Sequence, residues 1–179
     1  MNKKLSILEM NRMNIEEFKQ SEKLPLIVVL DDVRSLYNVG SVFRSSDAFR
    51  VKAIYLCGIT ATPPHPEIHK TALGAEDTVE WKYFKDTMDA VKYLKDNEVE
   101  VYATEQVHNS IKLQHLQLEK NKCYAIIMGN EVKGVKQQVV DSADACIEIP
   151  QFGTKHSLNV SVTAGIVIWE FARQLLVED

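Results

Sequence analysis

The chain has 179 residues, of which 45% are hydrophobic and 26% charged, and its formal net charge is −4. This length and composition are typical of one soluble globular domain and exclude fibrous and disordered chains. The acidic balance argues against a general nucleic-acid binder, although it leaves room for a local basic patch. The longest apolar runs, LPLIVVL and CYAIIM, are far shorter than the roughly 20 residues that a membrane span requires.

The N-terminal segment has no sustained apolar core and no small-residue cleavage site, so we expect no secretory signal and a cytoplasmic protein. Its apolar residues predict a short helix docked on the domain or on a partner: Ile7, Leu8, Ile15 and Phe18. We therefore divide the chain into an N-terminal helical extension, residues 1–24, and one domain, residues 25–179.

Strands are predicted where β-branched apolar runs recur, over 26–32, 51–58, 99–105, 123–129 and 145–150. Helices are predicted from an Asn38 cap to about Arg50, from an Asp86 cap through Leu94, over 136–140, and over 157–176.

Residues 59–81 are crowded with Pro, Thr and Gly and predict a long surface loop with one helical turn, and residues 109–121 are ambiguous. The alternation of strands and helices predicts an α/β fold, a mainly parallel sheet with helices on both faces.

Cysteine and histidine spacing predicts no metal site. Cys57, Cys123 and Cys146 lie in apolar segments without CxxC spacing, which indicates buried reduced thiols rather than disulfides or zinc ligands. His65 and His69 lie in the Pro-rich loop without partner ligands, so we interpret them as surface histidines.

Three predicted strands end in unusually polar segments, DDVRSLYNVGSVFR, MGNEVKG and IPQFGTKHSLN. In an open parallel sheet, ligands bind at the carboxyl ends of the strands, so these segments could converge on one ligand. No G-x-G-x-x-G or P-loop pattern occurs, which excludes the usual phosphate cradles.

In this order, the three segments resemble the motifs of the SpoU/TrmH family of RNA 2′-O-ribose methyltransferases, part of the SPOUT superfamily. The first motif matches Asn38, Gly40 and Arg44. The second matches Gly129, Asn130, Glu131 and Gly134. The third matches Ile149, Pro150, Gly153, Ser157, Leu158, Asn159, Val160 and Ser161. The resemblance covers roughly residues 25–172, and the three motifs together are specific where one alone would be weak.

The resemblance implies a C-terminal deep trefoil knot, which composition and periodicity do not indicate. It also implies S-adenosylmethionine as the cofactor and a ribose 2′-hydroxyl of RNA as the methyl acceptor. Relatives are homodimers whose composite active site joins the cofactor loops of one subunit to the arginine of the other. Both tRNA and rRNA are family substrates, and the short N-terminal extension favours tRNA.

From these motifs and their neighbours we expect three sets of site residues. The catalytic set is Arg44, Asn38, Glu131, Ser157 and Asn159. The cofactor-binding set is Thr104, Met128, Gly129, Asn130, Gly134, Ile149, Pro150 and Leu158. The RNA-binding set is Arg34, Gly40, Ser41, Lys155 and His156.

Several of these residues have a structural alternative. Arg44 could simply pair with Asp47 on an exposed helix. The resemblance instead implies a place at the acceptor ribose, where Arg44 would help to remove the 2′-hydroxyl proton or would clamp phosphate and stabilise charge. Guanidinium is a poor base, which favours the clamp, and action as a base would need an unusual environment. Asn38 could cap a helix, and Gly40 could serve packing rather than the approach of RNA. Glu131 could be a solvated loop carboxylate.

Ser157 and Asn159 could belong only to the N-cap of the last helix. That helix is apolar enough to form a dimer face or to pack in the core, through Val160, Val162, Ile166, Val167 and Trp169. Two other functions stay open: a non-catalytic RNA-binding relative of the same fold, and an enzyme or binder that acts on a non-RNA ligand.

Overall fold

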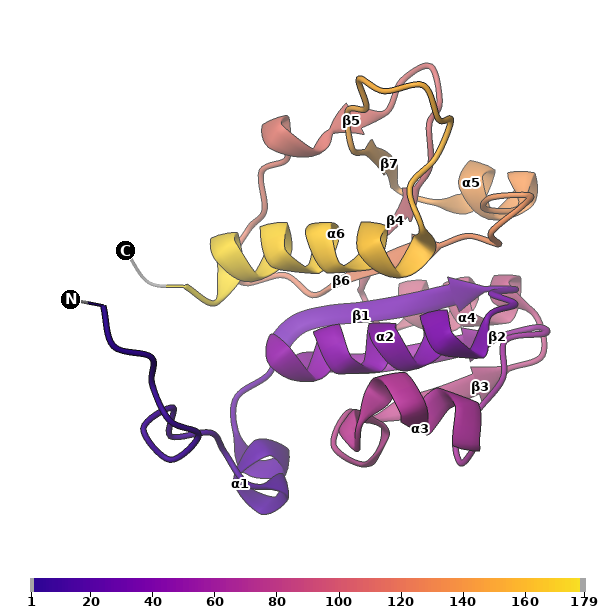
Figure 1. The fold of residues 1–179 in the computed structure, drawn as a ribbon. Coiled ribbons are helices and arrows are strands. Elements are labelled where there is room, and N and C mark those ends of the chain that lie inside the picture. Colours follow the sequence, from indigo (N-terminus) through magenta and orange to yellow (C-terminus); the bar gives the residue numbers. More distant parts are fainter. Residues whose placement is uncertain (1, 178–179) are drawn as a thin grey trace.

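The computed structural model describes residues 2–177, which form a seven-stranded parallel sheet with helices on both faces (Figure 1). The strands are β1 (Leu24–Asp31), β2 (Val51–Cys57), β3 (Trp81–Phe84), β4 (Glu100–Thr104), β5 (Ile111–Lys112), β6 (Tyr124–Met128) and β7 (Ala145–Glu148). The helices are α1 (Ile15–Gln20), α2 (Leu36–Ala48), α3 (Pro66–Ala72), α4 (Thr87–Asp96), α5 (Gln137–Ser142) and α6 (Val160–Leu175). The strand order is β3-β2-β1-β6-β4-β7-β5, and every pair is parallel.

Alternate side chains of β1 enter two separate cores, which confirms the expected fold class. Leu26, Val28 and Leu30 pack in the core beneath α2 and α6. Ile27 and Val29 pack in the other core, beneath α4 and α5. Burial on both faces explains why this strand is a continuous apolar run rather than an alternating one.

All five predicted strands are present, and two short ones were missed. The exposed or half-exposed residues of β3 give it no continuous apolar run, and the two residues of β5 lie inside the ambiguous segment 109–121. The segment 59–81 also holds more structure than one helical turn, namely α3 and a 3₁₀ turn over Ala75–Asp77. A second 3₁₀ turn covers Leu113–His115.

Two predicted helix starts were wrong by about one turn. The cap of α2 is Ser35, whose hydroxyl accepts from the N–H of Asn38 at 3.2 Å, so the Asn38 side chain does not cap this helix. The last helix begins at Val160 and is capped by Asn159 rather than opening at Ser157. The Asp86 cap of α4 is confirmed.

The sheet order brings chain segments together that are far apart in sequence. Leu30 of β1 lies opposite Met128 of β6, and Ala103 of β4 lies between Ile127 of β6 and Cys146 of β7. The carboxyl ends of these strands therefore share one edge of the sheet. After β7 the chain returns so that α6 packs beside α2 and over β1 (Figure 1).

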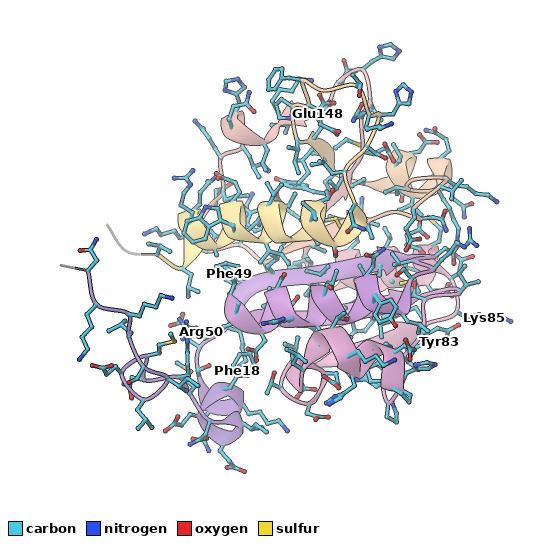
Figure 2. The ribbon with its side chains drawn as sticks, viewed as in Figure 1. Phe18, Phe49, Arg50, Tyr83, Lys85 and Glu148 are labelled. Carbon is cyan, nitrogen blue, oxygen red and sulfur yellow. The ribbon has the colours of Figure 1, made fainter. Side chains whose placement is uncertain are left out.

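In the N-terminal extension, only one of the four apolar residues expected to dock is buried. Asn14 and Glu17 form a capping box at the start of α1, and Phe18 is buried (Figure 2). Ile7, Leu8 and Ile15 are exposed. The first strand begins at Leu24, and the division of the chain into an extension and a domain stays a prediction.

The three cysteines are free, with Cys57 buried and Cys123 and Cys146 partly buried. Burial raises the pKa of the Cys57 thiol to about 12, so this thiol is protonated at neutral pH. Over residues 2–177, no helix combines the length and the apolar character that a membrane crossing needs.

Candidate active site

A pocket with a volume of about 690 Å³ lies at the carboxyl ends of β4, β6 and β7. Pockets for small ligands and cofactors commonly have volumes of roughly 300–1,000 Å³. Seven of the eight expected cofactor residues line it: Thr104, Met128, Gly129, Asn130, Gly134, Ile149 and Leu158. Pro150 is not among the lining residues, although its neighbours Ile149 and Gln151 are.

One wall of the pocket is a closed loop over residues 129–134. The backbones of Asn130 and Gly134 exchange two hydrogen bonds, of 3.1 and 2.9 Å. The Asn130 amide accepts from the N–H groups of Val132 and Lys133 and donates to the carbonyl of Asp32 at 2.7 Å. These bonds fix the loop and tie it to the end of β1.

Both glycines of this loop are required by close contacts. A Cβ at Gly129 would lie 2.2 Å from the backbone carbon of Gly134 and from the nitrogen of Val135. Gly134 has a φ of +69°, and a Cβ there would lie 2.3 Å from Oε2 of Glu105. That oxygen accepts from the N–H of Val135 at 3.0 Å. Residues with side chains would therefore displace this wall.

The opposite wall, residues 149–159, presents unpaired polar groups. From Gln151 to Leu158 no backbone N–H donates a hydrogen bond to another part of the described chain. The loop is held by Gln106, whose side-chain amide donates to the carbonyl of His156 at 3.2 Å. In addition, Thr104 lines the pocket, and its buried hydroxyl has no hydrogen-bond partner within residues 2–177. Because a buried hydroxyl normally has a partner, Thr104 can bind a polar ligand. The unbonded N–H groups of the loop can do the same, since most of its residues are exposed.

Three side chains from the three motifs form one hydrogen-bonded network. The Glu131 carboxylate accepts from the backbone N–H groups of Arg34 and Ser35, both at 2.9 Å, and from the Asn38 amide at 3.1 Å. The Asn38 oxygen accepts in turn from the Asn159 amide at 3.2 Å. The network therefore joins the start of α2, the loop after β6 and the start of α6.

Glu131 is held in its charged form by this network. Burial alone would raise the pKa of its carboxyl, but the N–H donors of Arg34 and Ser35 outweigh that effect and lower the pKa below its usual 4.5. Asn38 is 8% exposed with both ends of its amide bonded, and Asn159 also accepts from the N–H groups of Ser161 and Val162. Glu131, Asn38 and Asn159 therefore hold the three motifs in place relative to one another.

A second polar cluster beneath the pocket was not identified from the sequence. Asp31 is fully buried; it accepts from the Thr87 hydroxyl at 2.5 Å and from the N–H of Lys136 at 3.0 Å. The Lys136 ammonium lies 2.7 Å from Asp32, and this hydrogen bond raises the pKa of Lys136. The cluster anchors the segment between β6 and α5 to the end of β1. In the sequence, two consecutive acidic residues at the end of an apolar strand, Asp31 and Asp32, are the feature that could have indicated this cluster.

Arg44 lies outside the pocket, exposed on α2. Among the described residues its guanidinium has no hydrogen bond or ion pair, so the predicted alternative of pairing with Asp47 is wrong. Asp47 instead accepts from the Thr78 hydroxyl at 2.6 Å. Ser157 is exposed and lines the pocket, where its hydroxyl is available.

Of the five residues expected to contact RNA, Gly40 is in the wrong environment for that role. It is buried under α3, where a Cβ would lie 2.1 Å from the Thr71 hydroxyl and 2.3 Å from the carbonyl of Ile68. Its function is to let α2 and α3 pack closely. The other four stay predictions: Arg34, Lys155 and His156 are exposed and Ser41 is half-buried.

The histidines of the Pro-rich loop have structural partners. Nδ1 of His65 accepts from the N–H of Glu67 and caps α3, and His69 pairs with Glu76 at 2.5 Å. Nowhere in residues 2–177 do three or more His, Cys, Asp or Glu side chains gather in a way that could hold a metal ion.

The fold and the pocket define an α/β protein that binds a ligand at the carboxyl edge of a parallel sheet. The chain belongs to the SpoU rRNA Methylase family, whose model matches residues 25–169.

Two relatives with named activities are similar over nearly the whole chain. The tRNA (guanosine(18)-2′-O)-methyltransferase of Thermus thermophilus is 30% identical over 168 residues, which cover 94% of this chain and 84% of that protein. The 23S rRNA (guanosine-2′-O-)-methyltransferase of Neisseria meningitidis is 28% identical over 170 residues, covering 94% and 67%.

Two solved structures have the same fold. The TrmH/SpoU tRNA modifying enzyme of A. aeolicus superposes with a TM-score of 0.78 at 26% identity, covering 89% of this chain and 80% of that one. The AdoMet-bound rRNA methyltransferase of Sinorhizobium meliloti superposes with a TM-score of 0.79 at 28% identity. That match covers 88% of this chain and 62% of the other, so this chain spans less than two thirds of that protein's length.

Proposed function

We propose that this protein transfers a methyl group from S-adenosylmethionine to a ribose 2′-hydroxyl of tRNA or rRNA. The observation that carries the proposal is the pocket, whose walls contain the second and third motifs and are joined to the first by the Glu131–Asn38–Asn159 network. The similarity to relatives named as tRNA and 23S rRNA guanosine 2′-O-methyltransferases, and to an AdoMet-bound structure, supports the substrate and the cofactor.

The residues of the pocket fit the proposed cofactor. Three features suit a ligand that has a purine, a ribose and an amino acid: the pocket volume, the unbonded N–H groups of the lining residues Gln151 and 156–158, and the unpartnered hydroxyl of Thr104. Leu158, 39% exposed at the pocket, supplies an apolar surface. When bound, S-adenosylmethionine supplies a methyl group that its sulfonium already activates.

The protein must then align the ribose hydroxyl and stabilise the charge that develops as its proton leaves. The amides of Asn38 and Asn159 are held rigidly by the network, and the exposed Ser157 hydroxyl can donate to the ribose or to a phosphate. Within residues 2–177, the Arg44 guanidinium has no partner that would compete for RNA. Because guanidinium stays protonated at neutral pH, we assign Arg44 to phosphate binding and charge stabilisation rather than to proton removal.

A homodimer with a composite site is part of the proposal. Arg44 is absent from the pocket of its own chain, so a second copy would have to supply it. On α6, Val160 and Val167 are buried, whereas Val162, Ile166 and Trp169 are 51%, 38% and 47% exposed. Trp169 packs against Phe49, at the C-terminal end of α2, with ring centroids 5.6 Å apart. This exposed apolar stripe is the face on which we propose that the second copy docks.

The trefoil knot and a cytoplasmic location belong to the same proposal. The knot is supported by the path of the chain, since β6 enters between β1 and β4, β7 lies beyond β4, and α6 returns over β1. We propose tRNA rather than rRNA as the substrate, and the similarity to the Thermus thermophilus tRNA enzyme supports this choice.

The test is transfer of labelled methyl groups from S-adenosylmethionine into tRNA and rRNA, each purified from a strain that lacks the gene. Nuclease digestion and nucleoside mass spectrometry should then find one 2′-O-methylated nucleoside in one of the two RNAs. The Arg44→Ala variant should lose roughly 100-fold or more in turnover, as expected when a charge-stabilising donor is removed. Its affinity for S-adenosylmethionine, measured by calorimetry, should be unchanged because we assign Arg44 to the RNA and not to the cofactor.

The absence of methyl incorporation into either RNA, with cofactor binding demonstrated, would favour a non-RNA substrate or a non-catalytic RNA-binding protein. Near-wild-type turnover of the Arg44→Ala variant would remove Arg44 from the mechanism and leave the rest of the proposal in place.

A further inference from the structure

The outward face of α2 forms a stripe of four residues that do not enter the core. Tyr37, Ser41, Arg44 and Ala48 recur at intervals of four, three and four, and all are exposed except Ser41, which is half-buried. The stripe contains no carboxylate. The exposed Arg34 precedes it, and the half-buried Arg50, labelled in Figure 2, follows it. The one carboxylate of α2, Asp47, is half-buried and accepts from the Thr78 hydroxyl at 2.6 Å. A polyanion lying along the stripe would therefore meet no carboxylate of the stripe itself.

Tyr37 is the aromatic residue of this stripe, and its position is well defined although its side chain is 49% exposed. Its carbonyl accepts from the Thr71 hydroxyl of α3 at 2.9 Å. A hydrogen bond with Glu67 raises the pKa of the Tyr37 hydroxyl and so keeps it protonated. Glu67 is itself paired with Lys70 at 2.7 Å, which reduces its repulsion of a phosphate. The backbone of Tyr37 is thus held against α3, and its ring is open to solvent.

The sequence neighbour of Tyr37 is Asn38, which belongs to the network that joins the three motifs. Seven residues separate Tyr37 from Arg44, and at 1.5 Å per residue this is about 10.5 Å along the helix. Stacked nucleotides rise about 3.4 Å each along a strand, so three of them, or fewer where bases are splayed out, span this distance.

We propose that the Tyr37 ring stacks on an unpaired base of the substrate RNA, within about three nucleotides of the ribose at which Arg44 acts. This inference rests on the proposed function. In this proposal, Tyr37 binds a single-stranded or unpaired segment of the RNA next to the methyl acceptor. Aromatic rings stack on any base, so the contact contributes affinity and placement rather than base identity.

The test measures steady-state methyl transfer with tRNA and with 23S rRNA from a strain that lacks the gene. Base stacking on an aromatic residue contributes roughly 1–3 kcal/mol, and a tenfold change corresponds to about 1.4 kcal/mol. The KM of the Tyr37→Ala variant for RNA should therefore rise about tenfold, with kcat and the affinity for S-adenosylmethionine unchanged. Tyr37→Phe and Tyr37→Trp keep a ring and should stay within about threefold of wild type.

The matched control is Tyr93→Ala, which removes a tyrosine that is 39% exposed on α4, on the opposite face of the sheet, and should leave the KM unchanged. A second readout is salt: the slope of log KM against log salt should be the same in Tyr37→Ala as in wild type, because no charge is lost. An arginine-to-alanine change at a phosphate contact reduces that slope by about one.

If wild type methylates RNA and Tyr37→Ala has an unchanged KM, the stacking role is refuted and the proposed function stands. If wild type methylates neither RNA, the proposed function itself fails. A Tyr37→Phe variant as impaired as Tyr37→Ala would assign the effect to the hydroxyl and overturn stacking. A lower native mass of the Tyr37→Ala protein than of wild type would also overturn stacking, because Tyr37 would then contact a second copy of the chain.

Discussion

At the scale of single residues, Glu131 places a negative charge against the N-terminus of α2. The first N–H groups of a helix have no partner within the helix, and the helix dipole favours an anion there. Most helices use a side chain of their own first residues for this purpose. Here Ser35 caps one N–H, and a carboxylate almost a hundred residues away in sequence binds two more just before the helix.

The Glu131→Gln variant should therefore be less stable than wild type at neutral pH, by about 1 kcal/mol, the usual effect of a lost helix cap. The pKa of Glu131 is lower in the folded protein than its usual 4.5. The contribution of the charge is thus complete above about pH 4.5 and is lost as pH falls through the folded pKa. Urea unfolding of both proteins should show the full difference at about pH 7 and a progressively smaller one as pH falls below 4.5.

A Glu119→Gln variant is the control, since Glu119 is a surface carboxylate paired with Lys122 three residues away. Such exposed pairs contribute about 0–1 kcal/mol. A destabilisation of Glu131→Gln that stayed constant across the whole pH range would contradict the role of the charge.

At the scale of elements, the loop after β6 is built by backbone contacts, so its glycines matter more than its side chains. Gly129→Ala should force the wall formed by residues 129–134 to move, because its Cβ would overlap the backbone of Gly134 and Val135. We expect the affinity for S-adenosylmethionine to fall by about tenfold or more, measured by calorimetry, which corresponds to about 1.4 kcal/mol.

Gly153→Ala is the matched control for this prediction. Gly153 lies in the opposite loop but does not line the pocket, and a Cβ there meets no atom within 4 Å. Its affinity for the cofactor should equal that of wild type. Unchanged binding by Gly129→Ala would mean that the loop adapts without affecting the pocket, or that the cofactor binds elsewhere.

At the scale of the whole molecule, the proposed dimer explains how an arginine outside the pocket acts on its ligand. The native mass of wild type, measured by light scattering, should be twice the chain's 20.3 kDa. Ile166→Glu places a charge in the middle of the exposed stripe of α6 and should give a monomer, because an unpaired charge is costly to bury. Ile111→Glu, at a residue of almost equal exposure on β5, should remain a dimer.

Mixing Arg44→Ala with Gly129→Ala separates a composite site from a site within one chain. In a mixed dimer, the intact pocket of the first variant would meet the intact Arg44 of the second. If subunits exchange freely, about a quarter of wild-type activity should return, since half of the dimers are mixed and each has one working site. No recovery, with mixed dimers detected by native mass spectrometry, would place Arg44 and the pocket in the same subunit.

The main elements of this fold follow from local sequence. The buried strands β1 and β6 are continuous apolar runs, and the Asp86 cap of α4 is visible because capping involves residues that are close in sequence. The short edge strands β3 and β5 were missed because they are not buried on both faces. Gly40 could not be interpreted from local sequence either. Only the position of α3 shows that this glycine is a packing contact and not part of an open surface.

The sequence alone determined the fold class and the order of the motifs. Of the eight residues that it predicts to bind the cofactor, seven line the pocket, and their contact with the cofactor stays a prediction. Apolar periodicity and motif spacing are properties of neighbouring residues, so they can be read directly. The tertiary structure alone decided that Glu131 binds the start of α2, that Lys136 anchors to Asp31 and Asp32, and that Arg44 lies outside its own pocket. The contacts of Glu131 and Lys136 join residues about a hundred positions apart, and only the order of strands in the sheet brings those residues together.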